Sequence, residues 1–173
     1  MATSLTTRIA LSVTASMTDT TIVLPDGTSP VVPLNFQKVL NWASGTIVDT
    51  ADRIYMKRHT IATGTPLALD LSGGLTDLLG NVITMAKVTG IFIVNNSLTV
   101  GEKLTIGAGS NPLLNWIAAT GDALQIGPGG VHCQLDPSLA AYAVTGATGD
   151  VLTIAAAAGA AVSTDVVIVG RSA

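Results

Sequence analysis

Hydrophobic and polar residues alternate in short runs along most of the chain, with the period of two that is typical of β-strands. These runs are rich in β-branched residues, and Gly, Pro, Asn or Asp bound them. They cover residues 7–15, 53–61, 66–72, 81–96, 102–108, 122–128, 130–136, 141–146, 150–156 and 165–170. Because no long amphipathic helix separates them, the pattern predicts an all-β, antiparallel β-sandwich. A jelly roll is the expected arrangement, although the pattern leaves other sandwich topologies open.

Two short segments have a spacing closer to that of a helix. Residues 34–45 place apolar side chains at roughly helical intervals and end in a glycine, but an extended arm fits them equally well. Residues 74–80 are expected to form a one-turn helical link between antiparallel strands. Helix is therefore expected only in one or two short turns.

Prolines divide the N-terminal section from the rest of the chain. Residues 23–34 carry three prolines and a Pro-Asp-Gly turn, which indicates a break. We predict an N-terminal arm or extension over residues 1–50 and a β-sandwich domain over residues 51–173. Phe36 and Trp42 are candidate anchors through which the arm contacts a neighbouring protein. In the alternative, residues 7–15 simply complete the sheet.

The composition indicates assembly with other subunits. Apolar residues make up 48% of the 173 residues. Charged residues make up only 11%, whereas typical globular domains contain about 25% charged residues. A surface with so little charge is expected to be partly covered, so we predict a homo-oligomer, with a trimer favoured over a dimer. The net charge of -3 provides no basic field for binding nucleic acid.

Cysteine content and hydropathy limit the function further. Cys133 is the only cysteine, so an intrachain disulfide and a thiolate cluster for zinc are both excluded. The N-terminus is too polar for the apolar core of a signal peptide. The longest run of small apolar residues, 154–162, is far shorter than the roughly 18 residues that span a bilayer. No membrane segment is expected.

The glycine-rich stretch LDLSGGLTDLLGNVITM, residues 69–85, has the local outline of a phosphate-binding loop. A Walker loop also needs a lysine after its last glycine, whereas the first lysine here is Lys87. The GxGxxG pattern of dinucleotide-binding folds is absent as well. We interpret the stretch as a corner between strands and expect no cofactor.

Catalytic and metal-binding patterns are equally sparse. His132 and Cys133 are adjacent in a predicted strand, which directs their side chains to opposite faces, and no GxSxG elbow occurs. Asp122, Asp136, Asp150 and Asp165 lack the spacing of a calcium loop and lie where turns begin or end. We therefore expect neither a catalytic site nor a metal site, and no enzyme.

One local positive patch occurs in residues 53–61. Arg53 and Lys57 share a strand face with His59, while Arg58 lies on the other face. Such charges usually form a solvated face, and an acidic protein surface is the partner they would suit. Arg53 and Lys57 join Phe36 and Trp42 as candidate contact residues.

A longer pattern of motifs resembles a known group of proteins. The segments DLSGGLTDLLG, IFIVNN, PGG, GDVLTI and DVVIVG occur in this order between about residues 49 and 170. In this order they resemble small structural proteins of tailed bacteriophages. The resemblance implies a virion protein made in the host cytoplasm and placed on the capsid surface. Its role would be that of a decoration or cement protein that binds the major capsid protein and stabilises the head.

Two alternatives remain beside this role. The first is a component of a head or tail fibre, which the same resemblance allows. The second is a receptor-binding or carbohydrate-binding sandwich, which would present exposed aromatic rings to sugars. The chain has only two Phe, two Trp and two Tyr, and Trp116, in a loop-like segment, is the best candidate for exposure. A loop anchor packed on the core is the more common role of such a residue.

Overall fold

The computed structural model describes residues 4–107, 109–117, 121–157 and 159–173, and over these residues it contains strands and no helix. Every ladder between named strands is antiparallel. The strands are β1 (Thr7–Thr18), β2 (Val31–Trp42), β3 (Arg53–Ile61), β4 (Leu67–Asp70), β5 (Ser72–Thr76), β6 (Val82–Thr84), β7 (Lys87–Asn95), β8 (Leu104–Gly107), β9 (Ala123–Ile126), β10 (Val131–Leu135), β11 (Tyr142–Ala143), β12 (Val151–Ala156) and β13 (Val162–Arg171).

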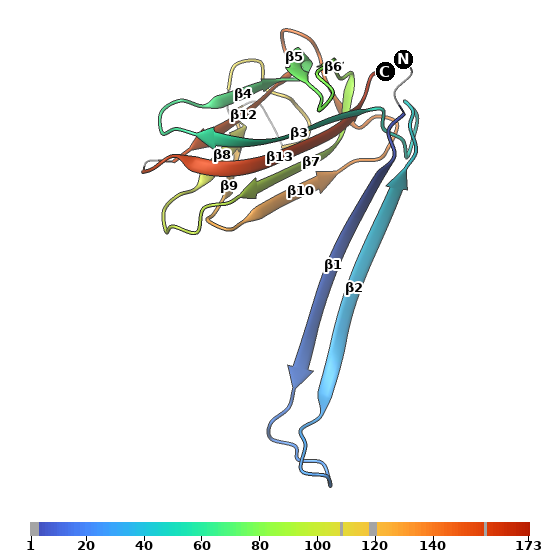
Figure 1. The fold of residues 1–173 in the computed structure, drawn as a ribbon, viewed down its shortest axis with the longest axis vertical. Coiled ribbons are helices and arrows are strands. Elements are labelled where there is room, and N and C mark those ends of the chain that lie inside the picture. The colour runs from blue at the N-terminus through green and yellow to red at the C-terminus, as the bar shows by residue number, and fades with distance from the viewer. Residues whose placement is uncertain (1–3, 108, 118–120, 158) are drawn as a thin grey trace. The chain divides into compact units, whose positions relative to one another are not determined.

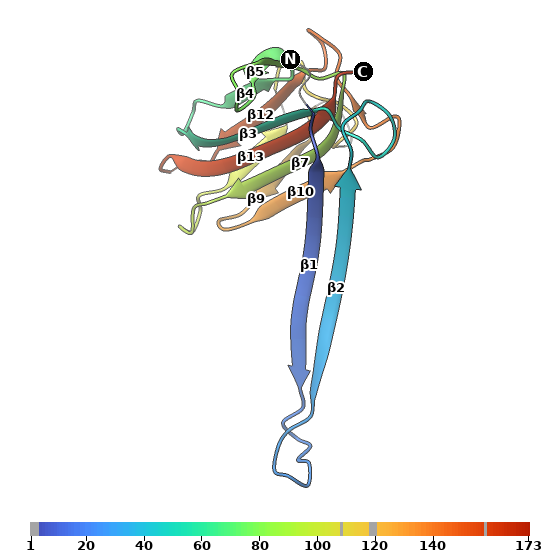
Figure 2. The same ribbon diagram turned by 45° about the vertical axis from the view of Figure 1, so that its right-hand side comes forward.

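The chain divides into two compact units. Thr6–Trp42 form a hairpin of β1 and β2, and the rest of the described chain forms a body with its own core. The body contains two main sheets, which Figures 1 and 2 show as stacked layers. One sheet has the strand order β10-β7-β13-β3, with β11 also paired to β7, and the other has the order β4-β12-β8-β9. Neither sheet closes on itself, so the body has the layers of a β-sandwich.

The pairing of strands in the body is nested along the sequence. β3 pairs with β13, the last strand, and β4 pairs with β12. Further inward along the chain, β7 pairs with β10 and β8 pairs with its neighbour β9. Two further ladders, β13 with β7 and β12 with β8, join these pairs into sheets.

The core lies between the two sheets and follows directly from alternation in the sequence. Along β13 the side chains of Val162, Thr164, Val166 and Ile168 are buried, while the alternate residues Ser163, Asp165 and Val167 are half-buried. Ile91 and Ile93 of β7 join the same core, opposite fully buried leucine and isoleucine side chains of β8 and β12. Each such side chain contributes about 1.5–3 kcal/mol through burial, so this core stabilises the body.

Two buried polar residues tie loops to the sheets. The Nδ2 group of Asn95 donates hydrogen bonds to the carbonyl oxygens of Glu102 and Gly127, at 2.8 and 3.0 Å. Arg171, at the end of β13, is fully buried and donates from Nη1 to the Ile47 carbonyl oxygen at 2.8 Å and from Nη2 to the Ser138 carbonyl oxygen. These bonds give the loop carbonyl groups buried donors and so hold the loops against the sheets.

Both helical expectations fail in the structure. Residues 34–45 fall largely within β2, so of the two interpretations the extended one holds for this segment. The one-turn helical link expected at residues 74–80 is wrong, because β5 and β6 form a small hairpin there. The turn is built by Asp77, whose Oδ1 accepts hydrogen bonds from the backbone N–H groups of Leu79 and Asn81, both at 2.8 Å. Gly80 completes the turn with a φ of 84°, which side-chain-bearing residues rarely adopt.

The segment 81–96, predicted as one strand, forms two. β6 pairs with β5 in the small hairpin, whereas β7 joins the sheet of β10, β13 and β3. The chain changes sheet at Met85 and Ala86, where the backbone N–H of Ala86 donates to the carbonyl oxygen of Arg171 at 2.8 Å. The glycine-rich stretch 69–85, interpreted from the sequence as a corner between strands, thus contains the end of β4 and the whole β5–β6 hairpin.

Candidate assembly surfaces

The β1–β2 hairpin, called the ribbon below, separates apolar from polar residues onto its two faces. Its strands pair over their full length, from Thr7 opposite Trp42 to Thr18 opposite Val31. Residues directly opposite one another in an antiparallel pair point to the same face, and successive pairs alternate between faces. One face, the apolar ribbon face, carries the pairs Ile9–Leu40, Leu11–Lys38, Val13–Phe36, Ala15–Leu34 and Met17–Val32. The other carries Arg8–Asn41, Ala10–Val39, Ser12–Gln37, Thr14–Asn35 and Ser16–Pro33.

The apolar ribbon face is exposed to solvent over most of its length. Val13 is 62% exposed, Met17 64% and Phe36 61%. An isolated two-stranded hairpin is marginally stable in water, because it has no second layer against which to bury such side chains. A contiguous apolar surface of this kind is typical of a site for association.

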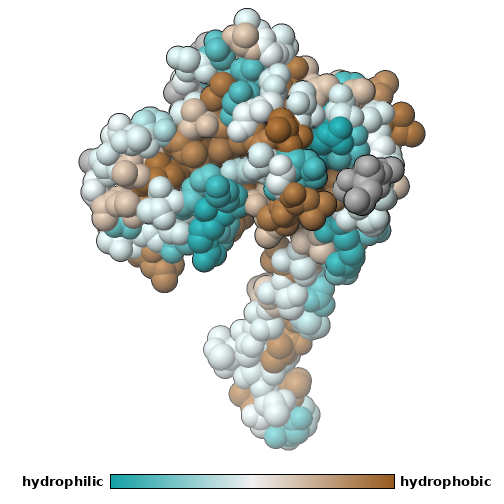
Figure 3. Space-filling model, turned by 45° about the horizontal axis from the view of Figure 1, so that its top comes forward, coloured by the Kyte–Doolittle hydropathy of each residue, from teal (hydrophilic) through white to brown (hydrophobic). Residues whose placement is uncertain are grey.

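A second apolar surface lies on part of the solvent side of the β10-β7-β13-β3 sheet. Ile91 and Ile93 of β7 face the core, so Phe92 and Val94 between them face outward. The strand registers place Met56, Val167 and Cys133 in one row with Phe92, and Val131 beside Val94. We call these six residues the outer sheet face. Met56 is 55% exposed and Val131 65%, and Figure 3 shows hydrophobic side chains in brown on the body as well as on the ribbon.

An ion pair borders the outer sheet face. Arg58 of β3 and Asp165 of β13 are register partners, and the Arg58 Nε and Asp165 Oδ1 atoms are 2.6 Å apart. The hydrogen bond from Arg58 lowers the pKa of Asp165 to about 2, so this carboxylate is charged at neutral pH. A shallow groove beside the pair is lined by Met56, Val167 and Leu78 among others. The outer sheet face is therefore apolar at its centre and polar at this edge.

The four candidate contact residues differ in availability. Phe36 is exposed on the apolar ribbon face, whereas Trp42 is only 2% exposed and leaves little of its ring for a partner. Lys57 is exposed on β3. Arg53 is half-buried, and its Nη1 donates to the Asp52 carboxylate at 3.2 Å. Phe36 and Lys57 are thus the two that offer an open surface.

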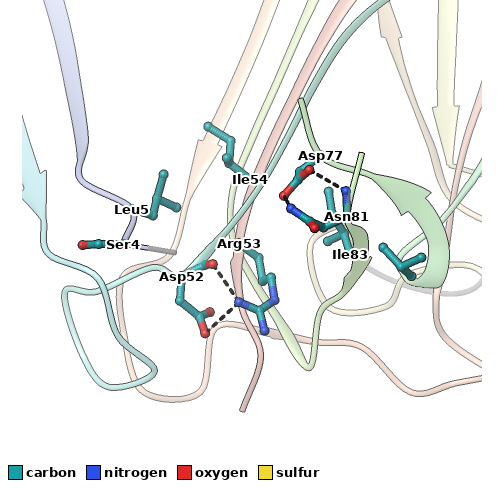
Figure 4. A pocket seen from close by; sticks show the side chains of 9 residues that line it. Ser4, Leu5, Asp52, Arg53, Ile54, Asp77, Asn81 and Ile83 are labelled. Atoms are coloured by element: carbon teal, nitrogen blue, oxygen red, sulfur yellow. Dashed lines mark hydrogen bonds and ion pairs between the residues drawn. The ribbon is translucent and has the colours of Figure 1, made fainter. Parts of the chain in front are cut away.

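Local hydrogen bonds hold both carboxylates that line a pocket beside Arg53 (Figure 4). The Asp52 carboxylate accepts hydrogen bonds from Arg53 and from the backbone N–H of Ser172, the latter at 2.8 Å. The Asp77 carboxylate is occupied by the turn that it builds and by the side chain of Asn81. Both carboxylates therefore hold local structure.

The two histidines and the lone cysteine lie in strands of the β10-β7-β13-β3 sheet. His132 packs edge-on against Trp116, with ring centroids 5.8 Å apart, and burial lowers the pKa of His132 below its usual value. Cys133 lies on the opposite face, as the alternation predicts. Trp116 is buried, so it anchors its loop on the core and is not exposed for contact with a sugar. His59 accepts or donates a 2.7 Å hydrogen bond with the Tyr55 hydroxyl, according to its tautomer.

The four aspartates considered for calcium are dispersed. The carboxylate of Asp136 accepts from the backbone N–H of Ser138 at 2.9 Å, and that of Asp150 accepts from Ala147 at 2.7 Å, as turn residues do. Asp165 is paired with Arg58 as described above. Among the residues that the structure covers, no group of three His, Cys, Asp or Glu side chains could hold a metal ion. Within the same residues, no helix is long and apolar enough to cross a membrane.

Comparison of the chain with protein-family models, with curated proteins and with solved structures found no match in any of the three. The features of the molecule that bear on its function are therefore the two apolar surfaces, the apolar ribbon face and the outer sheet face.

Proposed function

We propose that this chain is a virion structural protein, a capsid decoration or cement protein that binds the major capsid protein and stabilises a phage head. One observation carries the proposal: the ribbon, whose two strands have twelve residues each, presents a continuous apolar face with few charges. Such an element adds little to the stability of its own domain and suits contact with a neighbouring subunit. It is an attachment element of an assembly protein, through which the chain contacts either the capsid shell or a sister subunit that is itself bound to the capsid.

The strand order supports a jelly-roll topology for the body. In a jelly roll, a long antiparallel pair of strands is rolled up so that the first strand meets the last and the innermost two are neighbours. The nested pairs β3–β13, β4–β12, β7–β10 and β8–β9 follow this order. This architecture recurs in viral capsid and lectin domains, and the fold alone does not choose between them.

A weak contact repeated many times suits this composition. A capsid presents one surface in many copies, so an oligomer that engages several of them binds far more tightly than one contact would allow. With 11% charged residues, the chain is suited to apolar, nearly neutral contacts. We therefore propose a homo-oligomer on the capsid surface, with a trimer favoured over a dimer.

The sugar-binding alternative has less support than a structural role. The rings of Trp42, Tyr55, Trp116 and Tyr142 are all buried, which leaves no stacking platform among them. Phe36 is exposed, but it lies within the row of aliphatic residues on the ribbon. The exposed ribbon would also suit a head or tail fibre component, which differs from a decoration protein in its location on the virion.

Labelling of virions tests the proposed location. Gold-conjugated antibodies against the purified chain are applied to intact particles of the phage that encodes it and viewed by electron microscopy. We expect gold spread over the head surface in many copies. Gold confined to the tail would support the fibre alternative, and particles that carry no gold and none of the chain by mass spectrometry would overturn the virion proposal.

A further inference from the structure

We propose that the apolar ribbon face of one copy packs on the outer sheet face of a second copy of this chain. This inference rests on the proposed function only in that both require assembly. It differs from capsid binding, because here the partner of the apolar ribbon face is a second copy of the chain. Each copy then gives one ribbon and receives another, and the copies close into a ring or a reciprocal pair.

The two surfaces match in kind. The outer sheet face is open around Phe92, Val94 and Val167, whereas Val169 further along β13 is only 1% exposed, so the ribbon can lie across the first three of these residues. Sheets pack face to face about 10 Å apart when side chains from both inner faces interdigitate. Val13, Phe36 and Met17 on the ribbon have the size for such a layer against Phe92 and Val167.

The area favours this contact over the pairing of two ribbons with each other. A strip about 40 Å long and about 10 Å wide offers about 400 Å², whereas stable interfaces bury about 800 Å² per partner. Ribbon against ribbon would bury only that strip in each copy. In a reciprocal pair each copy contributes both a ribbon and a sheet face, so two contacts hold the pair where ribbon against ribbon gives one.

The single charge on the apolar ribbon face also favours this arrangement. Lys38, opposite Leu11, is the one charged residue of that face. Parallel ribbons around a shared axis would bring the Lys38 ammonium groups of all copies to one level, where they repel one another. On a neighbour's sheet, the aliphatic part of Lys38 can cover apolar surface while its ammonium group reaches the polar rim that contains Asp165.

The native Cys133 provides a direct test, because it lies on the outer sheet face and is the only cysteine. Ala15→Cys and Leu11→Cys place a thiol on the apolar ribbon face, and Ser16→Cys and Ser12→Cys place one on the polar face as matched controls. The purified full-length variants are treated with a short bis-maleimide and separated on a denaturing gel. Peptide mass spectrometry identifies the linked cysteines.

We expect the apolar-face variants to form links to Cys133 between chains at least tenfold faster than the polar-face controls. The largest linked species on the gel shows how many copies of the chain the oligomer contains. Equal or absent linkage from both faces would overturn the proposal, as would a link to Cys133 confined within single chains. Oligomers that still form efficiently when Cys133 is also replaced by Ser would show ribbon-to-ribbon contact, which overturns it as well.

A second measurement uses the unmodified chain and does not depend on the added cysteines. The rate of alkylation of Cys133 is followed as the protein is diluted from its assembled state. We expect alkylation to be at least tenfold slower in the assembled protein, because a neighbour's ribbon covers the outer sheet face. A rate that is independent of assembly would contradict this. Neither experiment uses capsids, so their failure is distinct from failure of the virion proposal.

Discussion

Replacement of Phe36 by Thr removes the largest exposed side chain of the apolar ribbon face and places there a β-branched residue, which favours the strand conformation of β2. Phe36 is 61% exposed in the single chain. If a neighbour covers this part of a side chain of about 200 Å², about 120 Å² leaves water, which corresponds to about 3 kcal/mol. Thr retains part of that contact, so we expect the substitution to weaken each contact by about 2 kcal/mol, or about thirtyfold.

Sedimentation velocity over a range of protein concentrations measures this change. The midpoint of assembly of Phe36→Thr is expected at a concentration at least about thirtyfold higher than that of the unmodified chain, since every contact in the oligomer is weakened. Gln37→Thr is the matched control, because Gln37 is the next residue in the same strand and lies on the polar face. Circular dichroism should show that both variants keep the β spectrum, since the core lies in the body.

Two results would refute the reasoning. If Phe36→Thr assembles at the same concentration as the unmodified chain, the apolar ribbon face is not part of the interface. If Phe36→Thr and Gln37→Thr weaken assembly equally, the effect comes from the stability of the hairpin and not from one of its faces.

Three further predictions concern the body, and denaturant unfolding of the purified chain measures each of them. Gly170→Ala should lower the free energy of unfolding by about 2 kcal/mol, because an added Cβ would lie 2.5 Å from the carbonyl oxygen of Lys87, which backbone pairing holds in place. An unchanged denaturation midpoint would contradict this prediction and show that β13 can shift to accommodate the added methyl group. Asn95→Ala should cost about 3 kcal/mol, since it removes the buried hydrogen bonds from Nδ2 to the carbonyl oxygens of Glu102 and Gly127; a loss below about 1 kcal/mol would contradict this. Burial lowers the pKa of His132, so the unfolded state takes up a proton at higher pH than the folded state, and stability should fall as the pH drops below about 6.5. His132→Gln should reduce that pH dependence, and an identical pH profile would refute the assignment.

The strands were predictable because their signal is local. β3 was expected over residues 53–61 and spans Arg53–Ile61, since alternation and flanking turn residues define it without reference to other strands. The turn after β5 was mistaken for helix because Leu75, Leu78 and Leu79 have helical spacing. The Asp77 carboxylate instead caps a hairpin turn. This turn forms because β5 pairs with β6, which the local sequence does not reveal.

The two apolar surfaces could not be derived from the sequence alone. The alternation in residues 7–15 was visible, but its partner strand and register were not, because the loop over residues 19–30 is too long to fix a register by turn type. In β7 the run from Ile91 to Val94 is apolar on both faces, so it has no alternation that would mark Phe92 as outward-facing. Pairing over long sequence separations, such as β3 with β13, leaves no local signal.

The central claim, that this chain stabilises a capsid, is tested most directly by heating phage heads with and without it. Heads assembled without the chain are mixed with purified protein, freed of unbound chains and heated in steps, while a dye reports the release of DNA. We predict saturable binding in a fixed number of copies per head and DNA release at a higher temperature than in undecorated heads, with Phe36→Thr less effective at equal concentration. Failure of the unmodified chain to bind heads, or binding that leaves the release temperature unchanged, would contradict the account.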